Sequence, residues 1–482
     1  MAGADARPPG PAGVPLLGSL LDLRNDSLGT FLRAQREHGD VVRLSAGPPG
    51  LRAELYAVFS AEGAQQVLAG EAANFRKDSS VYQEIRESLG NGLLTSQDED
   101  YLRQRRLVQP LFTRRRVDGY AAAVATETDS LLRTWHGRTG GPGGPATTLD
   151  VGTEMMGLAL RTVARILFGT DVDAAAAVVD RCFPVITEYT LRRGYSPLKL
   201  PRQVPTPANR RAAAAISELY GVCDQIIAGR GGAGVRHGED HGDDPGTETD
   251  NGDGDGAGSG AGEDLLTLLA AARSAQDTAF DADELRDQVL IFLLAGHETT
   301  ATSLAFSLWL LARHPEVQDR ARAEISQVLG DRTPEAADLD KLPYLTQVLK
   351  EAMRLYPAAP VIGRRAVAAA EIGGRVIPAG ADVIVAPWVT HRHPRYWPDP
   401  ERFDPNRFTP EAEAARPRYA WFPFGGGPRA CIGQHFSMLE SVTALAMLLR
   451  AYAFESDTGS VAVSAGITLS SATPLNCRLR PL

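Results

Sequence analysis

Cysteine is scarce in this chain of 482 residues. The four cysteines lie far apart and no two of them form a CxxC pair: Cys182, Cys223, Cys431 and Cys477. Neither a disulfide framework nor a zinc site is therefore indicated. The absence of paired cysteines favours a reducing compartment, and we expect the protein to be cytoplasmic.

The N-terminal sequence lacks the features of a targeting or membrane segment. It opens MAGADARPPGPAGVPLLGSL, with no basic stretch before an apolar run and no long apolar segment. We therefore expect neither a secretory signal nor a membrane anchor. The chain also has no strand–GxGxxG–helix unit, and no Gly-Lys-Ser/Thr follows its glycine-rich segment. A nucleotide-dependent dehydrogenase would need such a unit to bind phosphate.

Net charge says little about partners. The formal charge is −9, but residues 229–262 contain eight acidic and two basic residues and so account for six of these negative charges. This segment is mostly Gly, Asp, Glu, Thr and Ser, and has too few apolar side chains to offset the entropy of ordering it. We expect a disordered loop within a single domain that spans residues 1–482, and no nucleic-acid partner.

Helical patterns dominate the rest of the sequence. Apolar residues recur at helical spacing over 183–227 and 264–330, which are rich in Ala and Leu. Short β-branched segments at 41–45, 53–59 and 371–389 are interrupted by Gly and Pro, and they predict a smaller β component. The sequence thus predicts one large, mainly α domain with few strands.

The segment 424–433, FGGGPRACIG, is the most informative part of the chain. Its three consecutive glycines, beginning at Gly425, permit a tight turn and the close approach of a bulky partner. Arg429 places a positive charge near Cys431 and a helix is expected from Gly433, and both features stabilise a thiolate. A thiolate on such a turn suits a flat, iron-bearing cofactor, although an inert buried cysteine in a structural turn stays open as an alternative.

The spacing of Phe424, Gly427, Arg429, Cys431 and Gly433 resembles the haem-binding signature of the cytochrome P450 family. The resemblance implies the cytochrome P450 fold and a haem b cofactor. In that family the cysteine is the axial thiolate ligand of the haem iron, a role that falls on Cys431. Phe424 and Gly425 would then lie beside the cofactor.

A second group of residues interrupts a long apolar helix. The helix is expected to start at about Asp283, its N-cap, and to stop before Pro315; the polar sequence AGHETT breaks its apolar pattern at 295–300. Polar groups in a buried helix need partners or a function, so a satisfied polar patch is one interpretation and proton transfer through an acid–alcohol pair is the other. AGHETT matches the central helix signature of the family. The match implies that Ala295 and Gly296 face the oxygen-binding side of the haem. It also implies that Glu298 and Thr299 deliver protons to bound dioxygen.

The sequence also predicts roles for three single residues of this segment. Gly296 lacks a side chain, so a bulky group could approach the helix there. Thr299 can bond back to the preceding turn and open the helix locally. His297 is expected to pack against a neighbour or to form a hydrogen bond beside the helix.

A third group is structural. Glu351 and Arg354 form an ExxR sequence, one turn apart on a helix expected from near Tyr344 to before Pro357. Such a pair is usually an exposed ion pair of small value. The sequence PERF at 400–403 resembles the family's third partner, which implies that Arg402 joins the pair and fixes the segment that carries the cysteine loop.

Cations are expected around the carboxylates of the haem. Three arginines fall at positions where the family binds the propionates: Arg105, Arg364 and Arg429. Arg106 and Arg365 are adjacent, so the register is open. The family usually has Trp four residues before the first of these arginines, and this chain has Tyr101, whose hydroxyl can still donate a hydrogen bond.

The resemblance implies a monooxygenase that inserts one oxygen atom from O2 into a hydrophobic small molecule, by hydroxylation or epoxidation. We expect a terpenoid or polyketide of bacterial secondary metabolism, with a fatty acid as the alternative substrate and a non-catalytic haem-thiolate sensor or carrier as the alternative function. The expected pocket segments are 75–94, 187–204, 292–300, 358–362 and 466–470.

Electrons are expected from NAD(P)H through a separate ferredoxin and ferredoxin reductase, because the chain shows no flavin or iron–sulfur segment. An acidic ferredoxin could dock on a cluster of arginines. An ordinary solvated basic face is the alternative for this cluster, which comprises Arg103, Arg105, Arg106, Arg114, Arg115 and Arg116. The protein is expected to be a monomer.

Overall fold

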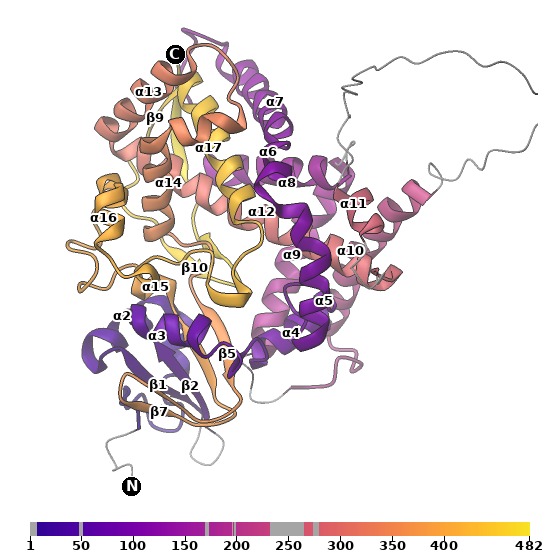
Figure 1. Ribbon diagram of the computed structural model, residues 1–482, viewed down its shortest axis with the longest axis vertical. Coiled ribbons are helices and arrows are strands. Elements are labelled where there is room, and N and C mark those ends of the chain that lie inside the picture. Colours follow the sequence, from indigo (N-terminus) through magenta and orange to yellow (C-terminus); the bar gives the residue numbers. More distant parts are fainter. Residues whose placement is uncertain are drawn as a thin grey trace, which may run out of the picture.

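A computed structural model describes residues 7–47, 52–168, 173–194, 196, 199–231, 265–272 and 279–482. Most of these residues are helical, and the largest sheet lies near the N-terminal end of the molecule (Figure 1). The expected mainly α fold with a small β component is confirmed. The expected loop at 229–262 falls outside the described residues, apart from 229–231, which belong to a helix that ends at Gly231.

The helices account for most of the sequence patterns described above. The ExxR pair lies within one of them, and the cysteine loop is followed directly by another. The α-helices of the described residues are α1 (Leu20–Asn25), α2 (Ser27–His38), α3 (Ala61–Gln65), α4 (Ser80–Leu89), α5 (Asp98–Val108), α6 (Arg114–Asp118), α7 (Ala121–Thr139), α8 (Val151–Phe168), α9 (Asp173–Gly194), α10 (Pro207–Gly231), α11 (Leu265–Ala271), α12 (Ala282–Arg313), α13 (Pro315–Leu329), α14 (Pro343–Leu355), α15 (Pro387–Thr390), α16 (Pro410–Ala414) and α17 (Gln434–Ala451).

The strands are short. Those of the described residues are β1 (Val41–Ala46), β2 (Ala53–Val58), β3 (Phe75–Arg76), β4 (Thr147–Asp150), β5 (Ile362–Ala366), β6 (Ala370–Ile372), β7 (Arg375–Ile377), β8 (Asp382–Val385), β9 (Tyr452–Glu455), β10 (Val463–Ala465), β11 (Leu469–Ser471) and β12 (Asn476–Pro481). The expected strands at 41–45 and 53–59 are confirmed within one residue. The segment 371–389 instead contains several short strands and ends in α15.

The largest sheet has the strand order β1-β2-β8-β5-β3. Its β2–β8 pair is parallel and its other pairs are antiparallel. Strands β4, β12 and β9 form a second antiparallel sheet, and β6–β7 and β10–β11 are separate hairpins. Both of these sheets therefore join strands from the first third of the chain with strands from its last third.

Helix α12 is the central helix of the molecule and packs against α8, α14 and α17 (Figure 1). Its N-cap is Asp281, not Asp283: the Asp281 carboxylate accepts from the Glu284 amide at 2.8 Å, and the Glu284 side chain accepts from the Asp281 amide at 3.2 Å. This reciprocal capping satisfies amides that the first turn leaves free. The helix ends at Arg313, ahead of Pro315, as expected.

Burial explains why α12 is so apolar. Its composition and length would allow it to span a membrane, but 78% of its most apolar stretch is buried inside the protein. Leu304, Leu308 and Leu311 are fully buried in the main core, and each contributes about 2 kcal/mol to folding by leaving water. The helix is therefore a core element that holds its central residues at a fixed place.

Candidate functional site

The cysteine loop leads from the 3-10 turn at 418–420 into α17. The Cys431 amide donates to the Phe424 carbonyl at 2.9 Å and so closes the loop. Gly427 has φ +64°, and a Cβ there would lie 1.9 Å from the Leu68 carbonyl oxygen. Gly425 has φ +69°, and a Cβ there would meet nothing closer than 3.9 Å. Packing thus requires glycine at 427, whereas the space beside Gly425 is open.

Cys431 faces a hollow within the protein. Its side chain is accessible, yet protein atoms surround it, and this combination marks a group that lines an interior space. Burial raises the pKa of the thiol, while the Gly433 amide and the positive charges of Arg105 and Lys77 act to lower it. Burial outweighs these groups, so the protein alone favours the neutral thiol, and a metal bound to the sulfur would be needed to hold the thiolate.

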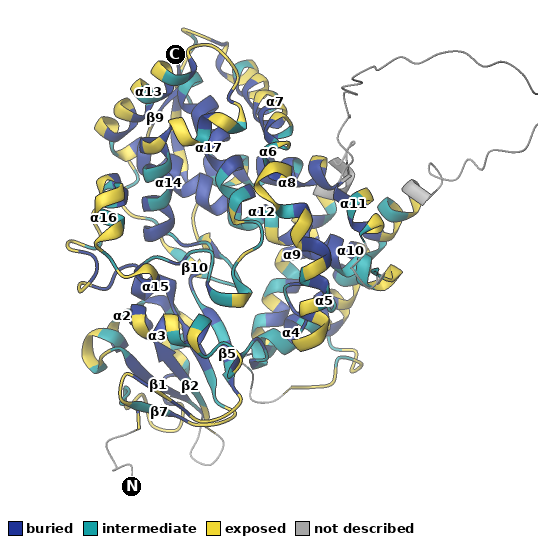
Figure 2. Ribbon diagram, viewed as in Figure 1, coloured by how far each residue is buried: buried dark blue, intermediate teal, exposed yellow. Residues whose placement is uncertain are grey.

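One face of α12 opens onto an interior space. Residues on both sides of this region are buried, whereas Ala295 is exposed and Glu298 and Thr299 are half-buried. Figure 2 shows the buried and less buried parts of the helices, α12 among them. Spacings of three and four residues put these side chains on one face of a helix. Thr300, the next residue, lies with its hydroxyl 3.3 Å from the Ser437 hydroxyl on α17, so this region of α12 packs beside the helix that follows Cys431.

Thr299 makes the expected hydrogen bond to the preceding turn. Its hydroxyl donates to the Ala295 carbonyl at 2.7 Å. The helix nevertheless continues without a break from Ala282 to Arg313, so the expected local opening is not seen.

Gly296 has a different role from the one expected. A Cβ there would lie 2.8 Å from Val163 Cγ2, so the missing side chain accommodates α8 and not a cofactor. The reason is helical geometry, since one residue after Ala295 the helix surface has turned by about 100°. His297 is 3% exposed and lies 3.8 Å from Asp180, which confirms that it packs beside the helix. Burial lowers the pKa of His297 to about 4.

The carboxyl group of Glu298 has a partner that the sequence did not indicate. The Thr468 hydroxyl, from the turn between β10 and β11, donates to Glu298 Oε2. Burial raises the pKa of Glu298, and the Thr468 hydroxyl partly opposes this shift. A carboxyl group with a raised pKa exchanges protons more readily near neutral pH.

Three cations, two of them buried and the third half-buried, have no counter-ion among the described residues. We call Lys77, Arg364 and Arg429 the cation cluster. Lys77 is 9% exposed and donates to the Leu94 carbonyl at 3.1 Å, and Arg364 is 4% exposed and donates to the Gly363 carbonyl at 2.7 Å.

Arg429 stacks on a neighbouring ring, and its Nη2 donates to Gln97 Oε1 at 3.2 Å. It donates to the Ser96 carbonyl at 2.6 Å and lies over the Tyr101 ring at 3.4 Å. Its Nη1 atom is buried without a partner in the described part of the chain.

Burial and, for Lys77 and Arg429, the charges of neighbouring cations disfavour the protonated form of the cation cluster. Burial lowers the pKa of all three groups, that of Arg429 to about 10. The charges of Arg364 and Arg429 lower the pKa of Lys77 further. A buried charge without a partner is costly, so the cluster fits a ligand that brings carboxylates. Two haem propionates would do so, with the iron at Cys431. Lys77 had no sequence signal, because a single lysine in a polar segment usually lies on the surface.

The remaining residues around the loop are placed as follows. Arg105 donates to the Ala430 carbonyl at 3.0 Å and so contacts the cysteine loop, whereas Arg106 is exposed. Likewise Arg364 is buried and Arg365 only half-buried. The Tyr101 hydroxyl donates to the Pro428 carbonyl at 2.6 Å. It therefore supports the cysteine loop and is not the donor to a propionate.

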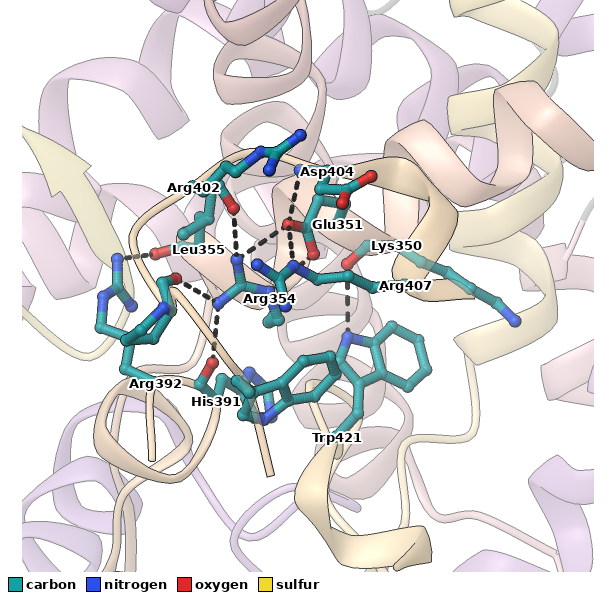
Figure 3. A network of polar contacts seen from close by, with 12 residues as sticks. Lys350, Glu351, Arg354, Leu355, His391, Arg392, Arg402, Asp404, Arg407 and Trp421 are labelled. Atoms are coloured by element: carbon teal, nitrogen blue, oxygen red, sulfur yellow. Dashed lines mark hydrogen bonds and ion pairs between the residues drawn. The ribbon is translucent and has the colours of Figure 1, made fainter. Parts of the chain in front are cut away.

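Glu351 and Arg354 form a fully buried pair. Arg354 donates to both carboxylate oxygens of Glu351, at 2.6 and 2.8 Å, and both side chains are 0% exposed. The Arg354 guanidinium also donates to the carbonyls of His391, Pro400 and Arg402 (Figure 3). The surface-pair interpretation is therefore wrong for these residues.

The third side chain of this network is Arg407 and not Arg402. Arg407 Nε lies 3.4 Å from Glu351 Oε1, whereas Arg402 is exposed and contributes only its carbonyl oxygen (Figure 3). PERF at 400–403 is followed at 405–408 by PNRF, and the later arginine is the one that turns inward. We call Glu351, Arg354 and Arg407 the Glu351 network.

The Glu351 network is connected to the cysteine loop. His391, whose carbonyl accepts from Arg354, accepts from the Phe422 amide at its own Nε2 at 2.9 Å. Burial lowers the pKa of His391 far enough to keep the ring neutral and able to accept. Phe422 lies two residues before Phe424, so a change in the network should alter the position of the cysteine loop.

Comparison with known proteins agrees with this geometry. The cytochrome P450 family model matches residues 8–468. The chain is 36% identical to cyclooctat-9-en-7-ol 5-monooxygenase of Streptomyces melanosporofaciens, over 91% of this chain and 87% of that protein. It is 32% identical to pentalenene oxygenase of Streptomyces avermitilis, over 91% and 89% of the two chains. The heme domain of cytochrome P450DA superposes with a TM-score of 0.83 at 26% identity and covers 99% of this chain and 98% of that one.

The family match extends over every element that builds the site, from the sheet through α12 and the cysteine loop to Thr468. An accessible thiol near positive charges, ahead of a helix that packs beside the acid–alcohol region of α12, is an arrangement suited to a haem. The chain belongs to the cytochrome P450 family, the haem-thiolate monooxygenases.

Proposed function

We propose that this monooxygenase inserts one oxygen atom from O2 into a terpenoid of bacterial secondary metabolism, by hydroxylation or epoxidation. The observation that carries the proposal is the acid–alcohol pair on a partly exposed stretch of α12, which packs through Thr300 and Ser437 beside the helix that follows Cys431. The names of two relatives, an oxygenase of pentalenene and a monooxygenase of cyclooctat-9-en-7-ol, support a cyclic hydrocarbon skeleton. Apolar side chains near the site, including Phe292 and Ile467, suit such a substrate.

The cofactor in this proposal is haem b. Cys431 would hold the iron, and the cation cluster with Arg105 would neutralise the propionates. The haem supplies activation of O2 once electrons arrive. The chain contributes the rest: Glu298 holds a proton, Thr299 passes it on through its hydroxyl, and the apolar walls exclude bulk water.

We propose that electrons come from NAD(P)H through a separate ferredoxin and its reductase. Part of the expected arginine cluster is already engaged, since Arg103 pairs with Glu284 and Arg114 with Asp340. Among the described residues, Arg106, Arg115 and Arg116 are exposed and make no ion pair. They flank the elements that support the cysteine loop and would attract an acidic partner. We propose a cytoplasmic monomer.

A titration of the ferric, haem-loaded protein with terpenes, macrolactones and fatty acids tests the substrate class. A ligand that displaces iron-bound water shifts the Soret band. We expect the shift with cyclic terpenes. A shift with fatty acids alone would contradict the terpenoid assignment, and a protein with no Soret band would contradict the haem site.

A pair of threonine variants tests proton delivery. Thr299→Ala should divert reducing equivalents from product to hydrogen peroxide, because the hydroxyl that passes the proton is lost. The matched control is Thr300→Ala, whose hydroxyl meets Ser437 and is buried away from the open face. Equal coupling of reductant to product in both variants would contradict the role of Thr299. Product formation itself separates a monooxygenase from a sensor or carrier.

A further inference from the structure

The hairpin of β10 and β11 brings a hydroxyl to the acid of the site. Ala465 pairs with Leu469, so Thr468 lies in the connecting turn. The Gly466 amide donates to the Thr468 carbonyl at 2.9 Å and keeps this turn tight. A Cβ at Gly466 would also lie 3.8 Å from Thr187 of α9, so the turn is enclosed between α9 and α12. The Thr468 side chain therefore starts from a fixed backbone.

Two contacts attach the hairpin to its surroundings without the help of Thr468. The Leu469 amide donates to the Ala358 carbonyl at 2.9 Å. The Thr302 hydroxyl donates to the Leu469 carbonyl at 3.0 Å, and Thr302 lies one turn after Glu298 on α12. Loss of the Thr468 hydroxyl should therefore leave the hairpin in place.

The Thr468 hydroxyl is the side-chain hydrogen-bond donor to Glu298 in the described part of the chain. It stabilises the ionised carboxylate and so opposes the effect of burial on the Glu298 pKa. Among the described residues, no titratable or charged side chain of α12, the hairpin or the cysteine loop acts appreciably on this carboxyl group. His297, next in sequence, lies on another face of the helix near Asp180.

We propose that Thr468 is the positioning residue for Glu298, holding its carboxyl group toward the hairpin and favouring the ionised form that takes up a proton from water. The inference rests on the proposed function and adds to it the residue that orients the acid. The proton is held on a carboxylate oxygen of Glu298 and would move through water to the Thr299 hydroxyl oxygen. The proton that this hydroxyl then releases would be consumed in the reduction of O2, whose second oxygen atom leaves as water. Thr468 makes no contact with the reacting atoms in this relay and acts through Glu298.

Infrared titration of the haem-loaded full chain measures the proposed effect without turnover. The carbonyl stretch of protonated Glu298 is the band that disappears in Glu298→Gln. In Thr468→Val, we expect the midpoint of its titration to rise by about one pH unit, because the ionised form loses its donor. Thr468→Ser should restore the midpoint of the unsubstituted protein.

The matched control is Thr302→Val, which removes a hydroxyl that attaches the same hairpin to the same helix but does not touch Glu298. Its midpoint should stay unchanged. An unchanged midpoint in Thr468→Val would overturn the proposal, and so would an equal rise in Thr302→Val, because the hairpin and not the hydroxyl would then be responsible.

The pH profile of coupled turnover completes the test. In Thr468→Val the alkaline limb should move upward with the infrared midpoint, since Glu298 then stays protonated to higher pH. A profile that does not follow the midpoint would overturn the functional part of the proposal. Failure of the proposed function looks different: Glu298→Gln would then keep full coupling at every pH.

Discussion

Two groups of buried or half-buried cations are connected to the cysteine loop, and they differ in whether the protein itself supplies the negative charge. In the Glu351 network, Arg354 has a bidentate carboxylate and three carbonyl oxygens as partners. In the cation cluster, Lys77 and Arg364 each have one carbonyl partner in the described residues, and Arg429 keeps an unpartnered buried nitrogen.

The difference distinguishes a structural site from a binding site. A buried ion pair with all its hydrogen bonds made is complete within the protein, and removing one partner leaves an uncompensated charge. A buried cation without a carboxylate is complete only when a ligand brings the charge. The Glu351 network should therefore stabilise the protein in the presence and absence of haem, whereas the cation cluster should be stabilising only in the presence of haem.

The largest effect is expected from breaking the Glu351 network. Glu351→Ala should lower the free energy of unfolding by about 3–5 kcal/mol, because Arg354 would stay buried without its carboxylate. The cysteine loop would lose its support through His391 and Phe422, so haem content should fall. Thermal unfolding and the Soret absorbance measure the two effects. Normal haem content would show that the network does not support the loop.

A comparison of two arginines sharpens the assignment within this network. Arg407 is 11% exposed and its Nε lies 3.4 Å from Glu351, so Arg407→Ala should destabilise the protein by about 1–3 kcal/mol. Arg402→Ala leaves the backbone carbonyl in place and should change stability by less than about 0.5 kcal/mol. Denaturant unfolding compares the two variants. The reverse order would restore Arg402 as the third partner.

Lys77 should leave a signature in the pH dependence of the haem-free protein. Its pKa in the folded state lies well below the ordinary value of 10.5. Between these two pKa values the unfolded chain binds a proton that the folded protein lacks, so the free energy of unfolding rises with pH, by up to about 1.4 kcal/mol per unit. Subtracting the profile of Lys77→Met isolates this contribution. Parallel profiles would mean that Lys77 is not buried as described.

The exposed arginines should give the smallest effect. Reversing the charge of Arg106, Arg115 and Arg116 should slow association with an acidic ferredoxin by about tenfold at low salt, and much less at high salt. The control is the same reversal at three exposed arginines of the N-terminal region: Arg24, Arg36 and Arg52. Stopped-flow reduction measures both. Equal slowing in the two variants would point to net charge alone and not to a docking face.

The sequence predicted the fold class and the main site motifs because each depends on a local pattern. Cys431 lies in a ten-residue signature, and α12 has apolar periodicity between a cap and a proline. The N-cap was misplaced by two residues because Asp281 and Asp283 are both good capping residues, and only the hydrogen bonds distinguish them.

The errors and omissions concern contacts between distant segments. Arg402 was assigned to the network on the PERF sequence alone. Arg407 also precedes Phe, and only the fold decides which of the two side chains turns inward. Gly296 was assigned to a cofactor, although its neighbour is Val163 on α8. Lys77 and Thr468 reach the site from other elements, and no local pattern marks a lone lysine or threonine. Such residues could be found only once the chain was folded.

The most direct test of the account compares Lys77→Met with and without haem. We expect the free energy of unfolding of the haem-free protein to stay the same or to rise, because a buried charge is removed. Haem should dissociate about tenfold faster, since a cation facing a propionate is lost, a change of about 1.4 kcal/mol. A destabilised haem-free protein with unchanged haem dissociation would contradict the account, because Lys77 would then be structural like the Glu351 network.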